Sequence, residues 1–287
     1  MARSPSHKLG QIIGDEFERS VHKLLEVFCD GHDLYLDYRH SRLARNGLKK
    51  VVWKDHNGNK HELDYVLEKG GTEGSIGRPV AFIESAWRRY TKHSRNKAQE
   101  IQGAVMPLAE TYSHVHPFLG AVLAGVFTQG SLDQLRSLGF KVVYCPYETI
   151  VRSFACAGVD VEFDEQSSDS DLQNRVDAIE RLGRDELSCI SNEILRLNND
   201  QFSGFVDALK RSVARRIDVI SIATLYGFDH TFHRVADAIA FVLGDEQQSV
   251  TDGKFVRYEL HVRYSNGDAI RGEFQSKTEA VNFIERL

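Results

Sequence analysis

The chain has 287 residues, 27% of them charged and 41% hydrophobic, and a net charge of −5, which is typical of a globular protein. The acidic balance argues against a protein that coats nucleic acid with its whole surface. The N-terminal segment has no apolar signal-peptide core, and the longest apolar run, 118–127, is too short for a membrane span of about 20 residues. The four cysteines are far apart, as reduced core thiols would be. We therefore expect a cytoplasmic protein without membrane contact.

Helix and strand patterns alternate in the first half of the chain. Apolar residues recur at spacings of three and four in the expected helices, and Asn57-Gly58 marks a hairpin turn. In chain order, the predicted elements are a helix at 11–28, a strand at 34–42, a hairpin at 51–67, a strand at 79–87, a helix at 94–112, a strand at 118–127, a short helix opened by Ser131 and a strand at 141–144. This order predicts an α/β fold with a mixed central sheet flanked by helices.

Two further regions are expected beyond this core. An acidic, serine-containing segment at 160–171 suggests a boundary, and Ser170 opens a capping box before helices that are predicted to continue to about residue 244. Near the end of the chain, apolar and polar residues alternate strictly, and an Asn266-Gly267 turn and a Ser276 helix cap follow. This pattern predicts a terminal β-hairpin and helix. We find no internal repeat in the sequence. The predicted domains are a catalytic core at 1–165, a helical recognition or dimerisation region at 166–250 and a hairpin–helix module at 251–287.

Two strand-like segments each carry one carboxylate. Asp64 ends the second arm of the expected hairpin, and Glu84 follows 20 positions later in the next strand. Five Arg or Lys residues and no acid lie between Glu84 and Glu100. Two acids that share a divalent metal, beside a group of cations, suit phosphodiester hydrolysis, because the metal activates water and phosphate while the cations hold the polyanion.

The order of these features resembles the PD-(D/E)xK, or restriction-endonuclease-like, nuclease superfamily over residues 11–144. That family places an acid on the first helix, an Asp on a hairpin strand and an (E/D)-x-K on the next strand. Glu18, Asp64 and Glu84 match the three acids. The family's lysine position, two after Glu84, is Ala86 in this chain.

The resemblance implies a restriction-endonuclease-like core and a Mg²⁺ ion held by Asp64, Glu84 and the backbone carbonyl of Ser85. Lys97 leans toward the core-facing side of the next helix, so we expect it to replace the missing amine. Glu18 is expected to hold a water or a second metal. Two acid-free runs of cations are expected to contact nucleic acid through Arg39, Arg42, Arg45, Lys49, Lys50, Arg88, Arg89, Lys92 and Arg95.

These features predict a Mg²⁺-dependent endonuclease of double-stranded DNA, possibly a homodimeric type II restriction enzyme. Each feature also has an ordinary interpretation, since lone acids at strand ends are usually solvated and Glu18 can simply pair with His22 along its helix. Ala86 favours an alternative, a catalytically inactive relative that binds nucleic acid or a partner protein in a defence system. A repair or RNA-directed nuclease of the same fold is a third possibility.

Overall fold

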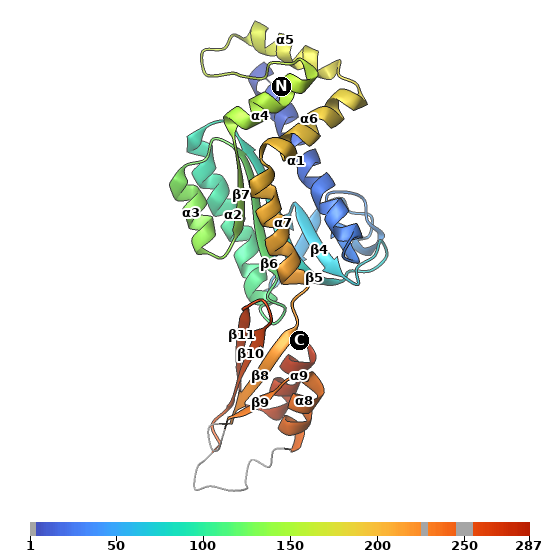
Figure 1. Cartoon of the computed structure of the whole chain (residues 1–287), viewed down its shortest axis with the longest axis vertical. Helices are drawn as coiled ribbons and strands as arrows, with labels where there is room; N and C mark the ends of the chain where they lie inside the picture. Colours follow the sequence, from blue (N-terminus) through green and yellow to red (C-terminus); the bar gives the residue numbers. More distant parts are fainter. Residues whose placement is uncertain (1–3, 225–228, 245–254) are drawn as a thin grey trace. The chain divides into compact units, whose positions relative to one another are not determined.

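The structure is a computed structural model that describes residues 4–224, 229–244 and 255–287, apart from the side chain of Lys92 (Figure 1). It divides into two compact units. Unit 1 contains the described residues up to Thr111 and Phe118–Leu209, and unit 2 contains Tyr112–Pro117 and the described residues from Lys210 onward. This division differs from the expected boundaries near residues 165 and 250. The expected α/β class with a mixed central sheet is confirmed.

A five-stranded mixed sheet forms the centre of unit 1. Its strands are β1 (Leu34–Asp37), β4 (Tyr65–Lys69), β5 (Arg78–Arg88), β6 (Phe118–Gly125) and β7 (Lys141–Pro146), in the order β1-β4-β5-β6-β7. The β1–β4 and β4–β5 pairs are antiparallel, whereas the β5–β6 and β6–β7 pairs are parallel. Strands β5 and β6 are nearly continuous apolar runs, as expected for strands that are covered on both faces.

The predicted hairpin at 51–67 is divided between two sheets. Strands β2 (Val51–Lys54) and β3 (Lys60–Leu63) form a separate two-stranded sheet that turns near Gly58, whose φ is +84°. The chain bends at Asp64 and continues as β4 in the main sheet. Asp64 therefore lies at the junction of the two sheets.

Helices cover both faces of the main sheet. Up to Val213 the helices are α1 (Pro5–Asp30), α2 (Thr91–Thr111), α3 (Gln129–Ser137), α4 (Tyr147–Phe154), α5 (Asp169–Glu180), α6 (Arg184–Leu197) and α7 (Asn199–Val213), with short 3₁₀ turns at Leu43–Arg45 and Ala155–Ala157. Of these, α5 packs against α1, and α6 packs against α1 and α4. Helix α1 packs near Trp87 of β5, and Phe205 of α7 packs against Phe118 and the same face. Helix α2 covers the opposite face of β5 and contacts α3 (Figure 1).

The helix starts show where local signals decide a boundary. Helix α1 is longer than the predicted 11–28, because Ser4 caps it and Pro5 occupies its first turn. The starts expected at Ser131 and Ser170 are wrong, since Thr128 caps α3 and Ser168 caps α5. The Ser276 cap is confirmed by its side chain, which accepts a hydrogen bond from the Glu279 N–H.

Unit 2 contains two consecutive ββα arrangements. Its elements are β8 (Ile217–Ala223), β9 (His230–Phe232), α8 (Val235–Gly244), β10 (Tyr258–Tyr264), β11 (Ala269–Phe274) and α9 (Lys277–Glu285). The sheet order is β11-β10-β8-β9, with β8 and β10 antiparallel at its centre. The expectation of helix throughout 217–223 is wrong, because these β-branched residues pair with β10. The predicted hairpin at Asn266-Gly267 is confirmed.

The two ββα arrangements are related in sequence as well as in order. Phe232, Ala238 and Phe241 of the first are matched by the same residue types 42 positions later in the second. The residues from both halves share one core, in which Ile220, Ile222 and Val262 are fully buried. Unit 2 is therefore an internal structural repeat, which corrects the expectation that the chain has none.

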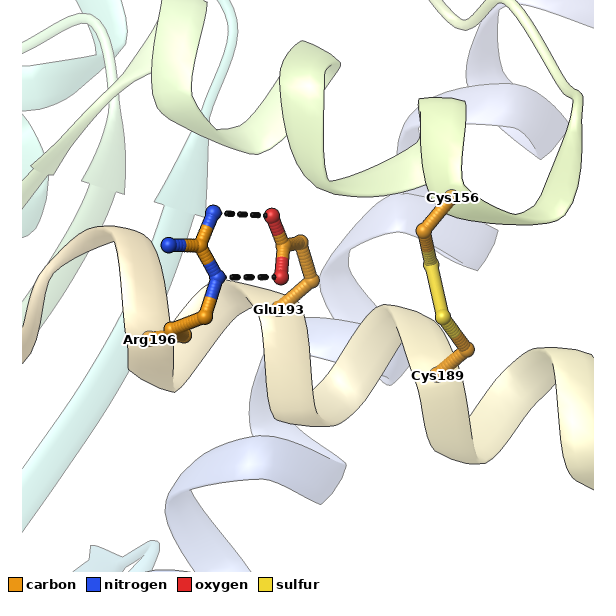
Figure 2. Close-up of a disulfide and its surroundings, with 4 residues drawn as sticks. All are labelled: Cys156, Cys189, Glu193 and Arg196. Carbon is orange, nitrogen blue, oxygen red and sulfur yellow. Dashed lines mark hydrogen bonds and ion pairs between the residues drawn. A yellow bond between two sulfur atoms is a disulfide. The ribbon is translucent and has the colours of Figure 1, made fainter.

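The cysteines differ from the expected set of four reduced thiols. Cys29 and Cys145 are buried thiols, and burial raises the pKa of each to about 12. Cys156, which is exposed, forms a disulfide with Cys189 of α6, 33 positions away (Figure 2). The disulfide joins the 3₁₀ turn that follows α4 to α6. Helix α6 also carries the Glu193–Arg196 ion pair.

Removing the disulfide should lower the stability of unit 1. A cross-link that closes a loop of this length restricts the unfolded chain, so Cys156→Ser with Cys189→Ser should lower the free energy of unfolding by about 3–4 kcal/mol. Urea unfolding with and without a thiol reductant measures the effect. The reductant should destabilise only the parent protein, and equal curves for parent and variant under oxidising conditions would contradict the prediction.

No helix within the described ranges is both long and apolar enough to cross a membrane.

Candidate active site

The candidate site is built around the Asp64–Glu84 pair. Tyr65 of β4 is paired with Ile83 of β5, so Asp64 and Glu84 follow as the next opposed residues of these antiparallel strands. Directly opposed residues lie on the same face of a sheet. Glu84 is only 4% exposed, while Asp64 is half-buried at the bend between β3 and β4. The two acids, predicted from separate segments, therefore lie side by side.

Reciprocal hydrogen bonds hold the two carboxylates in place. The Asp64 backbone N–H donates to Glu84 Oε1 at 3.1 Å, and the Ser85 N–H donates to Asp64 Oδ2 at 2.9 Å. The Ser85 N–H is thus directed at Asp64 and not at β6. In an extended strand, the N–H and C=O of one residue point to the same edge, so the Ser85 carbonyl also faces the Asp64 side.

Lys97 supplies a cation to this pair from helix α2. Its Nζ lies 3.6 Å from Glu84 Oε2, and the lysine side chain is 17% exposed. Ala86 is buried on the same face of β5 as Glu84, where the family pattern has its lysine. The structure therefore places the Lys97 ammonium beside Glu84, although the amine comes from the next element of the chain.

Glu18 approaches the pair from helix α1. The charge of Asp64 acts on it, and its backbone carbonyl accepts a 3.1 Å hydrogen bond from the Tyr65 hydroxyl. Although Glu18 as a residue is exposed, desolvation near its carboxylate is the main cause that raises its pKa, and Asp64 is the second. The positive charge of Arg39 opposes this shift.

The electrostatics of the site favour retention of a proton. Burial is the main cause that raises the pKa of Glu84 to about 8, the charge of Asp64 raises it further, and Lys97 opposes both. Burial is also the main cause that raises the pKa of Asp64. The hydrogen bond from the Ser85 N–H, the charge of Lys97 and a hydrogen bond shared with Glu84 each lower this pKa and oppose the effect of burial. The pair therefore retains a proton, on Glu84, at neutral pH.

Replacing Glu84 should stabilise the protein at alkaline pH. Because the pKa of Glu84 is higher in the folded protein than its ordinary 4.5, the native state holds the proton more tightly. The stabilisation that comes from this tighter proton binding by Glu84 is therefore complete below pH 4.5, and it is lost as the pH rises to about 8. Glu84→Gln should raise the free energy of unfolding by about 1–3 kcal/mol at pH 8 and by much less at pH 5.

Urea unfolding of Glu84→Gln and the parent protein at both pH values tests this expectation. Glu110→Gln, an exposed change on α2, is the matched control and should show no such pH dependence. A Glu84→Gln protein that is less stable than the parent at pH 8 would contradict the conclusion that burial destabilises the charged form of Glu84.

The residues present fit a divalent cation. Carboxylate and carbonyl oxygens are the ligands that Mg²⁺ prefers, and Asp64, Glu84 and the Ser85 carbonyl supply three of them at one strand edge. A divalent cation bound here would displace the proton that Glu84 retains and neutralise both carboxylates. Within the described part of the chain, no group of three or more His, Cys, Asp or Glu side chains could hold a metal. Glu18 therefore lies outside a direct ligand set.

Several cations expected to bind nucleic acid have internal partners instead. Arg42 is fully buried and lies 3.0 Å from Asp37 and 2.7 Å from Glu68. Arg45 is 3.3 Å from Asp37 and donates to the carbonyls of Tyr38 and His40. The nucleic-acid assignment of Arg42 and Arg45 is therefore wrong, because the buried carboxylate of Asp37 holds both side chains inside unit 1 and that of Glu68 also holds Arg42.

The second basic run is also divided. Arg89 donates to the Phe163 carbonyl and lies 4.1 Å from the ring centre of Tyr147, so it has a structural role that contradicts its assignment. Arg88 donates to the carbonyl of Trp87. The exposed members of the predicted set are Arg39, Lys49, Lys50 and Arg95. The side chain of Lys92 lies outside the described part of the structure.

Asp37 and Glu68 are the polar residues whose roles sequence patterns missed. Both are completely buried, and burial is the main cause that raises the pKa of Asp37. A weak signal existed for Glu68 alone, which follows the buried residues Tyr65, Val66 and Leu67 in β4. The sequence does not show which cations would pair with them.

Comparison of the chain with models of protein families, with curated proteins and with solved structures gave no match.

Proposed function

We propose that the protein is a metal-dependent phosphodiesterase that cleaves nucleic acid, with Asp64, Glu84, Ser85 and Lys97 at its centre. The observation that carries the proposal is the cross-strand Asp64–Glu84 pair with the Lys97 ammonium 3.6 Å from Glu84. This set provides the acids and the amine of the PD-(D/E)xK pattern, with the amine shifted from position 86 to position 97. The antiparallel β4–β5 pair followed by parallel β6 and β7 supports a restriction-endonuclease-like core.

The residues of the site have distinct roles in the proposed reaction. A divalent cation bound by Asp64, Glu84 and the Ser85 carbonyl would polarise the phosphate and lower the pKa of a nearby water. Lys97 would orient the attacking water and stabilise charge on the phosphate. Its ammonium lies 3.6 Å from Glu84 Oε2, so this role is electrostatic.

Double-stranded DNA is the substrate we propose. The exposed Arg39 acts electrostatically on Glu18, and the exposed Arg95 occurs on α2, the helix that carries Lys97. A type II restriction enzyme that acts as a homodimer is the narrower form of the proposal, because a symmetric site in duplex DNA is matched by a two-fold symmetric protein.

Incubation with supercoiled plasmid and phage DNA, in Mg²⁺ and in EDTA, tests the function. Discrete fragments that form only with Mg²⁺ would support a restriction enzyme, and a smear would support an endonuclease without sequence preference. Unchanged DNA that is nevertheless bound in a mobility-shift experiment would favour the inactive nucleic-acid-binding alternative, for which Ala86 is the specific observation.

Lys97→Ala should lower the single-turnover cleavage rate by about 10²-fold or more, which is the scale of a positioned charge-stabilising group. Lys97→Arg should restore little activity, because a planar guanidinium does not reproduce a compact ammonium. Adding Ala86→Lys to Lys97→Ala should recover part of the rate, since position 86 shares a face with Glu84. Lys97→Ala rates near those of the parent protein would refute the role of Lys97.

A further inference from the structure

The loop between β1 and β2, residues 38–50, is held rigidly although most of it lies at the surface. Arg42 Nη1 and Nη2 donate to the two Glu68 oxygens at 2.7 and 3.0 Å, and Arg42 also donates to the carbonyls of Thr72 and Ser75. Within the loop, the Ser41 hydroxyl donates to the Gly47 carbonyl. Burying a fully charged guanidinium is costly unless it is paired, so this loop is fixed in one conformation by a demanding arrangement.

The rigid loop exposes two leucines at its tip. Leu43 is 73% exposed and Leu48 is 66% exposed. They flank a tight turn in which Asn46 and Gly47 adopt φ values of +55° and +76°. The Gly47 N–H donates to the Arg42 carbonyl across this turn. Large aliphatic side chains that an ordered turn holds in an exposed position gain hydrophobic stabilisation when a partner buries them.

The charge around the leucines identifies the partner. The chain has no acidic residue from Arg39 to Lys54, and Lys49 and Lys50 follow Leu48 directly. Both lysines are exposed. On the Leu43 side, the exposed Glu73 carboxylate accepts a hydrogen bond from the Leu43 N–H, so the cations lie on the Leu48 side of the tip. An apolar Leu48 followed by two lysines is complementary to duplex nucleic acid, in which phosphates border an apolar base stack.

Both ends of the loop lie beside the acid pair. At one end, the loop leaves β1 at Asp37, which pairs with Val66, two positions after Asp64. At the other end, Lys50 Nζ lies 2.6 Å from Glu62 Oε2, and Glu62 acts on Asp64 from two positions earlier in the chain. A duplex whose phosphate lies at Asp64 would therefore extend over the loop.

We propose that residues 43–50 form a wedge that inserts Leu43 or Leu48 between base pairs of double-stranded DNA while Lys49 and Lys50 contact its backbone. This inference rests on the proposed function for its partner and deepens it by naming how the duplex is held. Insertion of an apolar side chain unstacks a base step and kinks the duplex, which presents a strained phosphate to the neighbouring site.

The test uses an Asp64→Asn background, which separates binding from cleavage, and duplexes that carry 2-aminopurine at successive positions. Unstacking raises the fluorescence of this base. We expect an increase at one or two adjacent steps in the background protein and its loss when Leu43→Ser and Leu48→Ser are added, with about tenfold or more weaker binding. Lys49→Gln with Lys50→Gln should keep the fluorescence increase and reduce the salt dependence of log K by about 2.

Val27→Ser is the matched control, because Val27 is an equally exposed aliphatic residue (67%) on α1 and should change neither signal. If the background protein binds DNA and the leucine changes alter neither fluorescence nor affinity, the wedge is refuted while the proposed function stands. If the leucine changes instead convert a dimer into a monomer in light scattering, the tip is an interface between copies and the wedge is refuted. If the parent protein neither binds nor cleaves DNA, the proposed function and the wedge both fail.

Discussion

Asp64→Asn protein is expected to bind DNA but to cleave it at least about 10³-fold more slowly than the parent. The amide keeps the shape of the side chain and an oxygen that can accept from the Ser85 N–H, 2.9 Å away in the parent. It removes the negative charge on which cation binding depends. Stabilisation of phosphate charge by a metal is worth several kcal/mol, and each 1.36 kcal/mol changes a rate tenfold.

Single-turnover cleavage and mobility-shift binding, both at fixed Mg²⁺, measure this separation. Binding in EDTA should equal or exceed that of the parent, because a carboxylate near phosphate is repulsive when no metal is bound. Asp133→Asn, an exposed change on α3, is the matched control and should leave the rate unchanged. Cleavage by Asp64→Asn within tenfold of the parent would refute the assignment of the site.

Arg42→Ala should lower the free energy of unfolding by about 3–5 kcal/mol, because it removes one partner from a buried ionic cluster. Two completely buried carboxylates, Asp37 at 3.0 Å and Glu68 at 2.7 Å, would lose their main cation. The loss should be smaller at pH 4–5 than at pH 7. Burial raises the pKa of Asp37, so that this carboxyl takes up a proton and no longer needs a counter-charge as the pH falls.

Urea unfolding of Arg42→Ala at pH 5 and pH 7 tests both statements. Arg39→Ala is the matched control, since it removes an exposed arginine three positions earlier and should change stability by no more than about 0.5 kcal/mol. A loss below 1 kcal/mol for Arg42→Ala at pH 7, or a loss that grows at low pH, would contradict the structural role of the cluster.

The parts of the fold that sequence patterns predicted depend on local signals. The apolar stripe of α1 is an example, because Phe17, Val21 and Leu25 recur at helical spacing and are all buried. The turn at Asn266-Gly267 is another, because the left-handed φ of Gly267 is a property of the residue itself. In the candidate site, the order of the acids along the chain predicted which strands carry them.

The parts that could not be predicted depend on residues far apart in the sequence. Arg42 and Arg39 look alike in an acid-free run, and only the positions of Asp37 and Glu68 distinguish a buried ion pair from an exposed cation. Strand β8 is similar, since the residues that pair with it come from β10, about 40 positions later. The composition of a segment does not contain this information, because tertiary pairing overrides local preference.

The central pairing of β8 with β10 has a consequence for shortened forms of this protein. A nonsense mutation shortly before β10 would remove β10, β11 and α9 together, which is half of the sheet and most of its buried core. Strand β8 would then present an unpaired edge with Ile220 and Ile222 poorly covered, and such edges recruit strands from other chains. The loss of the last 30 or so residues (from Tyr258 onward) should therefore yield an aggregating product that cellular proteases remove, and not a smaller working protein.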